Sequence, residues 1–320
     1  MASSDSRGAP GIGCGSAVVA FDIGGTDMKA AMVDRAGEFH AVTRIRTPRA
    51  EDDTADPALG ETARLLTEFR SARPDIVPAA AGLLVPGTVD EASGIGIYSE
   101  NLNWHNVPFR ERGEQLLCLP VAFGHDVREA AKAEYRLGPA RSYRNVVVMM
   151  VGTGISGAIF IDGQLYSAGG MAGEMGHSRV ADEPECTCGG RGCLEAVASA
   201  TAIARRYNRL TGRDEPGAKE VVQRAQAGDP DAVRIWDSAL DALALDLSHT
   251  VALLAPDAIV IGGGLAEAGP LLFDPLRTRL NALLTFHKHP MLLPASIGEN
   301  AGLVGAALLA RELVDGIGTT

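Results

Sequence analysis

The sequence predicts an α/β protein built from two domains of related fold. Residues 18–39, VVAFDIGGTDMKAAMVDRAGEF, and 146–165, VVVMMVGTGISGAIFIDGQL, each read as an apolar strand, a Gly-Thr turn, a second apolar strand and a tight turn with Asp and Gly. We interpret them as copies of one duplicated unit that opens with a β-meander and continues with helices, such as 56–72 and 127–137. A chance similarity of two glycine-rich hairpins is the alternative. With 320 residues, 46% of them hydrophobic, the chain is long enough for two domains.

Charge, hydropathy and cysteine usage limit the class of protein. Residues 1–16, MASSDSRGAPGIGCGS, are small and polar, so we expect a disordered tail rather than a signal peptide. No later stretch has the roughly 18 apolar residues of a membrane span. A net charge of −11 gives no electrostatic surface for nucleic acid or anionic lipid. Five cysteines, three of them close together, favour reduced thiols in the cytoplasm over disulfides. The sequence predicts a cytoplasmic protein without nucleic acid or membrane partners.

Three glycine-rich turns predict a site for phosphate groups. Without a Cβ the backbone can come close to a ligand, and successive N–H groups can converge on phosphate oxygens. Two of the turns belong to the duplicated hairpins, and the third, in DAIVIGGGLAEAG (257–269), stands between a strand and a helix. The alternative for any one turn alone is a structural role. The candidate phosphate-binding residues are Gly24, Gly25, Thr26, Gly152, Thr153, Gly154, Gly262, Gly263 and Gly264.

One histidine and three cysteines predict a metal site. Their spacing is C-x-C-x4-C with the histidine nine residues upstream, and the expected ligands are His177, Cys186, Cys188 and Cys193. One nitrogen and three thiolates suit tetrahedral Zn²⁺ and leave no open position, so the site is structural and a zinc-dependent hydrolase is disfavoured. Glu174 and Glu195 flank the motif. The metal would hold both acids in one rigid shell, although each glutamate could instead be a solvated surface residue.

Four motifs, in this order and separation, resemble the ROK family of sugar kinases within the actin-like ATPase superfamily. They are FDIGGTDMKAAMVD, GHDVREAAKAE, GEMGHSRV and CTCGGRGCLE. The resemblance covers about residues 17–315, and the cysteine motif is its most specific part. It implies two duplicated actin-like (ribonuclease H-like) domains with a cleft between them. We expect a small domain of residues 17–123 plus 303–320 and a large, zinc-binding domain of residues 124–302.

The resemblance implies ATP-dependent phosphorylation of a hydroxyl group of a sugar, a hexose such as glucose, or of a sugar-like cyclitol. Asp126, between the strand LPVAF and the helix VREAAKAEYRL, is the expected general base, since the attacking hydroxyl must lose its proton. A simple helix cap is its alternative role. Asp22 would hold Mg²⁺ or its waters. By the same resemblance, Glu174, His177 and Glu195 contact the hydroxyls of the acceptor.

By the same resemblance, the stretch YSENLNWHNVPF (98–109) corresponds to the one that contributes an amide and a second polar residue to the acceptor pocket. An amide suits a polyol because it offers both a donor and an acceptor. We choose Asn101 and Asn103, with turn formation as the alternative.

Two residues depart from the family pattern. Asp27 stands where a basic or amide residue is more usual, and we expect it to face away from the phosphates. His125 stands where an asparagine is usual and would select another hydroxyl pattern, so we expect glucose not to be the best acceptor.

The chief rival function is a sugar-responsive transcriptional regulator, since the family includes these. It needs a DNA-binding helix-turn-helix of roughly 60 to 80 residues ahead of DIGGT, where about twenty residues stand here. The sequence therefore favours the kinase. The apolar helix ALDALALDLSHTVALLA (239–255) predicts either core or a dimer surface, and the resemblance favours a homodimer.

Overall fold

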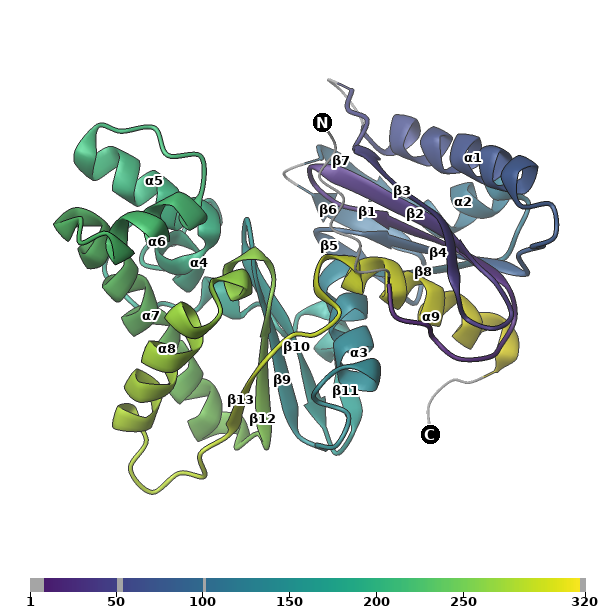
Figure 1. The fold of residues 1–320 in the computed structure, drawn as a ribbon. Coiled ribbons are helices and arrows are strands. Elements are labelled where there is room, and N and C mark those ends of the chain that lie inside the picture. Colours follow the sequence, from purple (N-terminus) through teal and green to yellow (C-terminus); the bar gives the residue numbers. More distant parts are fainter. Residues whose placement is uncertain (1–8, 51–53, 100–101, 317–320) are drawn as a thin grey trace. The chain divides into compact units, whose positions relative to one another are not determined.

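The computed structural model describes residues 9–50, 54–99 and 102–316, and the chain divides into two compact units. Unit 1 comprises residues 1–133 and 300–320, and unit 2 comprises residues 134–299. Each unit contains a five-stranded sheet in which a three-stranded antiparallel meander continues into two parallel strands (Figure 1). The duplication predicted from the two hairpins is confirmed by this shared topology.

The sheet of unit 1 has the order β3-β2-β1-β4-β8. Its strands are β1 (Val18–Ile23), β2 (Asp27–Val33), β3 (Phe39–Arg46), β4 (Ala80–Val85) and β8 (Val121–His125). Because β1, β4 and β8 are parallel, their carboxyl ends share one edge of the sheet. A smaller antiparallel sheet contains β5 (Thr88–Asp90), β6 (Ile95–Ser99) and β7 (Trp104–Val107).

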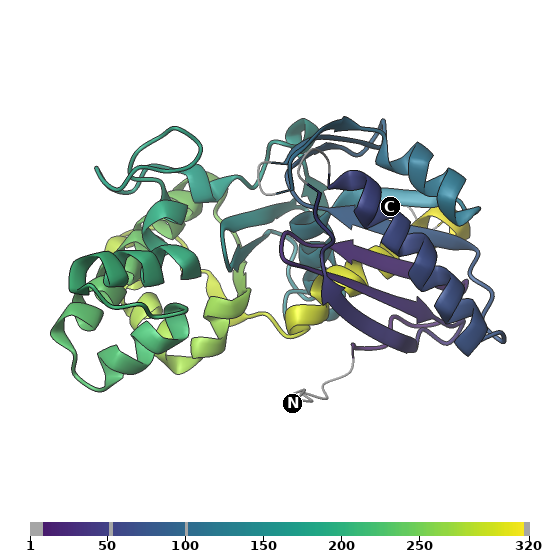
Figure 2. The same ribbon diagram turned by 90° about the horizontal axis from the view of Figure 1, so that it is seen from above.

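Helices cover both faces of the unit 1 sheet (Figure 1, Figure 2). Helices α1 (Ala55–Ala72) and α2 (Phe109–Leu117) pack with Phe21 and neighbouring apolar residues on one face. Helix α9 (Ala301–Asp315) covers the other face, where Gly82 of β4 lets the backbone of Ala306 come close. Helix α3 (Asp126–Leu137) follows β8 directly. The predicted helices 56–72 and 127–137 are confirmed. No described helix is long and apolar enough to cross a membrane.

The sheet of unit 2 has the order β11-β10-β9-β12-β13. Its strands are β9 (Val146–Val151), β10 (Ile155–Ile161), β11 (Gln164–Tyr166), β12 (Ala258–Gly262) and β13 (Met291–Pro294). The helices are α4 (Leu194–Ala198), α5 (Ala200–Thr211), α6 (Ala218–Gln226), α7 (Pro230–Leu254) and α8 (Pro270–Leu283). Short 3₁₀ helices are η1 (Ala168–Gly170), η2 (Met175–His177), η3 (Gly264–Ala268) and η4 (Gly298–Asn300).

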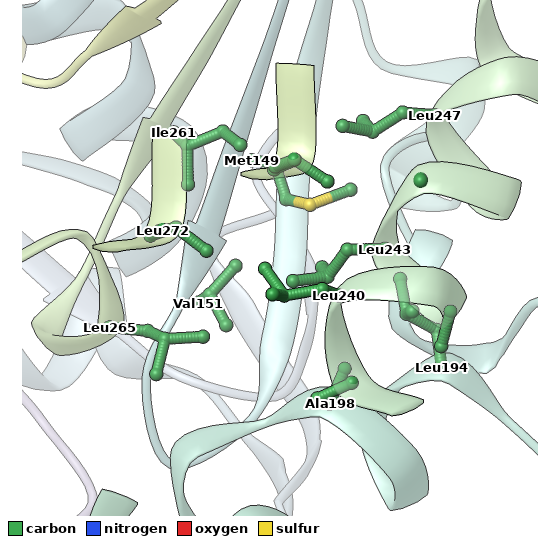
Figure 3. Close-up of a cluster of buried hydrophobic side chains, with 14 of the residues drawn as sticks. Met149, Val151, Leu194, Ala198, Leu240, Leu243, Leu247, Ile261, Leu265 and Leu272 are labelled. Carbon is green, nitrogen blue, oxygen red and sulfur yellow. The ribbon is translucent and has the colours of Figure 1, made fainter. Parts of the chain in front are cut away.

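The core of unit 2 lies between its sheet and its helices. Figure 3 shows Met149 and Val151 of β9 among the leucines of α7, with Leu240 and Leu243 buried beside them. Of the two roles predicted for residues 239–255, the structure therefore supports the core for this face of α7.

Two boundaries differ from the expected ones. Unit 1 ends at Ala133 and resumes at Asn300, rather than at 123 and 303, because the first turns of α3 pack closely on α9, where Gly305 meets the backbone of Glu129. The predicted disordered tail, residues 1–16, is wrong for residues 9–16. There the amide of Ile12 donates to the carbonyl of Gly37 (3.1 Å), and the hydroxyl of Ser16 donates to Asp315 (2.6 Å). Residues 1–8 lie outside the described part of the chain.

Candidate active site

Two acids lie at the shared carboxyl edge of the unit 1 sheet. Asp22 is near the end of β1, and Asp126 is the first residue of α3, immediately after β8. The side chain of Asp22 points to the face that α9 covers, and its carboxylate fills the space that a Cβ at Gly302 would occupy. Glycine at the start of α9 is therefore what lets this carboxylate take its position.

Burial perturbs the protonation of both acids. Burial, together with the nearby charge of Asp126, raises the pKa of Asp22 to about 7, and the charge of Lys29 opposes the shift. Burial also raises the pKa of Asp126 to about 6, against the N–H of Val127 (2.7 Å) and the charge of Arg128. Such shifts are characteristic of a site that binds a cation or accepts a proton.

His125 is buried and held by its neighbours. Its Nδ1 accepts the backbone N–H of Arg128 (3.3 Å), so a neutral ring carries its proton on Nε2. One carboxylate oxygen of Glu91 accepts the backbone N–H of His125 (3.3 Å) and the guanidinium Nε of Arg128 (3.0 Å). No local sequence pattern predicts this Glu91–Arg128 pair, since the two residues are far apart in the chain.

The first glycine turn, Gly24 to Thr26, joins β1 and β2. The amide of Gly24 donates to the carbonyl of Asp27 (3.0 Å), and Arg49 donates to the carbonyl of Gly25 (2.6 Å). The carboxylate of Asp27 pairs with Arg44 (2.8 Å) on β3, so its charge is compensated. Arg49 thus places a cation at this turn, and no sequence motif marked it as a candidate.

The second and third glycine turns lie together in unit 2, because they follow the neighbouring parallel strands β9 and β12. Gly263 has a φ of +81° and lies against the carbonyl of Val151, immediately before Gly152. A side chain at Gly263 would be strained and would clash with this carbonyl. Two of the predicted phosphate-binding stretches are therefore neighbours.

Glu195 connects the second glycine turn to the metal-binding segment. Its Oε2 accepts the backbone N–H of Ile155 (2.9 Å), and it lies 2.5 Å from where a Cβ of Gly154 would be. The glutamate is the second residue of α4, which begins directly after Cys193. The structure thus brings together one predicted acceptor-binding acid and one predicted phosphate turn.

Gly154→Ala should test this contact. We expect the new methyl group to displace the carboxylate of Glu195, because the space is already filled, while the fold remains stable. The expected result is a several-fold loss of acceptor affinity, measured by calorimetry. Gly152→Ala is the matched control, since a Cβ there meets nothing within 4 Å. Equal affinities of the two variants would contradict the role of this contact.

Glu174 and His177 lie on a segment packed along β10. The amide of Gly157 in β10 donates to the carbonyl of Gly173 (2.9 Å), and Gly176 lies against the carbonyl of Ile155. Both predicted acceptor-binding side chains are exposed. Close packing of the glycines holds the segment near the beginning of β10, next to the residue that binds Glu195.

The four predicted metal ligands converge. Their ligand atoms lie within 4.8 Å of one another, and the residues are His177, Cys186, Cys188 and Cys193. The Sγ atoms of Cys188 and Cys193 are 3.7 Å apart, and Sγ of Cys186 is 3.8 Å from Nδ1 of His177. Thiolates bound to one tetrahedral Zn²⁺ at its usual bond length lie about 3.8 Å apart. The donor set and its spacing therefore fit zinc.

The structure gives little support for acceptor binding by the two predicted asparagines. Asn101 lies outside the described residues. Asn103 is exposed in a turn with a φ of +50°, a conformation that asparagine adopts more readily than most residues. This geometry is sufficient to account for an asparagine here, and acceptor binding by Asn103 stays a prediction.

A pocket of about 490 Å³ lies beside the second glycine turn. It is lined by Thr153 of the turn, by one face of α5 and by the loop before α6, through Ala200, Thr201, Ala204, Arg205, Asn208, Pro216 and Gly217. Its size and mixed lining suit a small planar group with polar edges.

The duplicated five-stranded sheets, with acids and glycine turns at their strand ends, define an actin-like, two-domain α/β protein. The sequence model of the ROK family matches residues 18–313, and the chain belongs to this family.

Several relatives support this assignment. A glucokinase from Streptomyces coelicolor is 31% identical over 316 residues, covering 92% of this chain and 97% of that protein. The crystal structure of a ROK family glucokinase from Streptomyces griseus in complex with glucose and AMPPNP has a TM-score of 0.78 and 29% identity, covering 93% of this chain and 100% of that chain. The xylose repressor of Bacillus spizizenii is 25% identical over 235 residues, covering 72% of this chain and 60% of the repressor.

Proposed function

We propose that the protein transfers the γ-phosphoryl group of ATP to a hydroxyl group of a sugar or a sugar-like cyclitol. The observation that carries this proposal is the pair of acids, Asp22 and Asp126, at the shared strand ends of unit 1, both with raised pKa values. The similarity to a glucokinase across nearly the whole chain supports the same reaction class.

Asp126 would act as the general base. It accepts the proton of the acceptor hydroxyl as that oxygen attacks the γ-phosphorus, and its pKa near 6 leaves it ionised at neutral pH. Asp22 would hold Mg²⁺ directly or through its waters. When bound, Mg²⁺ neutralises the charge of the transferring phosphoryl group.

The glycine turns would bind the polyphosphate through backbone N–H groups. Arg49 adds a cation at the first turn, and the pocket beside Thr153 is our proposed site for the adenine ring. Adenine is planar with polar edges, which is the chemistry that this pocket accommodates.

The acceptor hydroxyls would be bound by Glu174, His177 and Glu195. A structural Zn²⁺ would hold these side chains in place. Nδ1 of His177 faces the Sγ of Cys186, which leaves Nε2 as the ring nitrogen for the acceptor. Four protein ligands close the coordination of Zn²⁺, so the metal fixes side chains and takes no part in the chemical step. His125 and Asn103 are the polar residues that we propose for unit 1, with Asn101 retained as a prediction.

The pH profile at saturating ATP and Mg²⁺ should show one acid limb, because a bound cation keeps the carboxylate of Asp22 ionised. Since burial raises the pKa of Asp126 from the usual carboxyl value to about 6, we expect kcat/KM for the acceptor to fall about tenfold per pH unit below pH 6. An ordinary carboxylate would remain ionised, and active, down to about pH 4. A profile that stays flat to pH 4.5 in stably folded protein would contradict the assignment.

The proposed function is tested by ADP formation with a panel of hexoses, amino sugars and cyclitols. We expect acceptor-dependent turnover, with glucose not the best acceptor, and a changed ranking in His125→Asn. An unchanged ranking headed by glucose would remove His125 as a specificity residue. A sugar-responsive regulator would bind a sugar without forming ADP, so binding without turnover would overturn the kinase.

The homodimer stays a prediction that light scattering can measure.

A further inference from the structure

Asp246 is an acid in the core of unit 2 that the proposed mechanism does not use. It lies on α7 and is only 3% exposed, in the stretch of helix that carries Leu243 and Leu247 (Figure 3). Its Oδ1 accepts a hydrogen bond from the hydroxyl of Ser178, and among the described residues its Oδ2 has no hydrogen-bond partner. Burial raises the pKa of this carboxyl, against the bond from Ser178 and the charge of His249.

An acid at this position is unfavourable for packing. A buried carboxyl with one unsatisfied oxygen costs stability, and an apolar side chain of similar volume would fill the same space without that cost. The core alone therefore gives no reason for an acid at position 246. Its hydrogen-bond partner supplies one.

Ser178 connects the two parts of the metal-binding segment. It follows His177 directly, and its carbonyl accepts the backbone N–H of Leu194 (2.9 Å). Leu194 stands between the ligand Cys193 and the acid Glu195. One residue thus touches the histidine side and the α4 side of the site, and its hydroxyl is the group that Asp246 holds.

Helix α7 is a firm support for this bond. It is 25 residues long, begins with a capping aspartate, Asp229, and packs against α4, α5, α6 and α8. The hydrogen bond to Asp246 on the buried face of α7 therefore fixes Ser178 relative to the core of unit 2, and not only relative to the loop that contains Ser178.

We propose that Asp246, acting through Ser178, is a positioning residue for the acceptor-binding side chains His177 and Glu195. The bond between the two residues sets the placement of η2 relative to α4, and so the distance between the histidine and the glutamate. This inference rests on the proposed function for the identity of the ligand, but not for the geometry of the metal ligands.

The test compares Asp246→Leu, Ser178→Ala and the double variant with Asp246→Asn as the matched control. In Asp246→Leu we expect the KM for the acceptor to rise about tenfold and zinc to pass faster to a chelator, as for other supports of metal ligands. The KM for ATP should change less than about twofold, and Tm should stay equal or rise, because a buried polar group is replaced by an apolar one. Ser178→Ala should raise the acceptor KM and speed zinc release in the same way but lower Tm, because it leaves both oxygens of the buried Asp246 without a partner. The double variant should add nothing further to the changes in KM and zinc release.

The control should retain wild-type values, since the amide of Asn can still bond to the hydroxyl of Ser178. Unchanged acceptor KM and zinc release in both Asp246→Leu and Ser178→Ala would overturn the proposal. An Asp246→Leu protein that unfolds or loses Tm would overturn it in favour of a purely structural role. If no acceptor is phosphorylated by the wild-type protein, the proposed function fails, while the rate of zinc release still decides the positioning role.

Discussion

Asp126→Asn is expected to bind ATP and the acceptor nearly as well as the wild type but to lose turnover by about two to four powers of ten. The amide has the shape of the carboxylate and cannot accept the hydroxyl proton. Asp126 stands at the strand edge with Asp22, and burial raises its pKa to about 6. The measurement is kcat at saturating acceptor, with both dissociation constants from calorimetry.

Asp75→Asn is a suitable control, because Asp75 is an exposed acid of the same unit that pairs with Arg73. It should leave turnover unchanged. A loss below threefold in Asp126→Asn would show that another group takes the proton. A loss of acceptor binding equal to the loss of turnover would make Asp126 a binding residue and not the base.

Cys188→Ser is expected to lose zinc and acceptor affinity together. Cys188 is the exposed thiol of the cluster, so its replacement leaves the core intact while removing one of four ligands. Without the metal, His177 and the α4 end that carries Glu195 are no longer held in one shell. We expect the acceptor KM to rise by about one to two powers of ten. Metal analysis and acceptor titration on the same sample measure both effects.

Cys118→Ser is the matched control, since Cys118 is an exposed free cysteine outside the cluster. It should keep one zinc per chain and wild-type affinity. Full acceptor affinity in a demonstrably metal-free Cys188→Ser protein would contradict the proposal that zinc positions the acceptor-binding side chains. Tight zinc retention by that variant would instead show that three ligands suffice.

The sequence was informative where function depends on local pattern. The two hairpins predicted the duplicated sheets, because alternation and turn residues are local properties of a strand pair. The spacing of the cysteines predicted the cluster, since the ligands lie within one short segment. The glycines of residues 262–264 predicted a turn at a strand end, and the strand order places it beside Gly152.

Other parts of the site depend on contacts between distant segments, which leave no local pattern. Glu91 follows β5 and Arg128 lies in the first turn of α3, and the two residues meet because β5 packs against β8. The close approach of Gly302 to Asp22 requires α9 to return to the first unit. Nothing in the sequence around Asp246 marks it as buried, and only the fold shows that its carboxylate accepts a hydrogen bond from Ser178. The order of residues 9–16 likewise comes from contacts with α9, not from their own composition.

Phosphoryl transfer from ATP to a hydroxyl group is tested most directly by following the γ-phosphorus. The protein is incubated with γ-labelled ATP, Mg²⁺ and the best acceptor of the panel. The products are then separated and identified by mass spectrometry. We expect one labelled phosphate monoester of the acceptor for each ADP formed, and a rate of labelling that is about two to four powers of ten lower when Asp126 is replaced by Asn. Label found only in inorganic phosphate, or no ADP formed with any sugar or cyclitol, would contradict it.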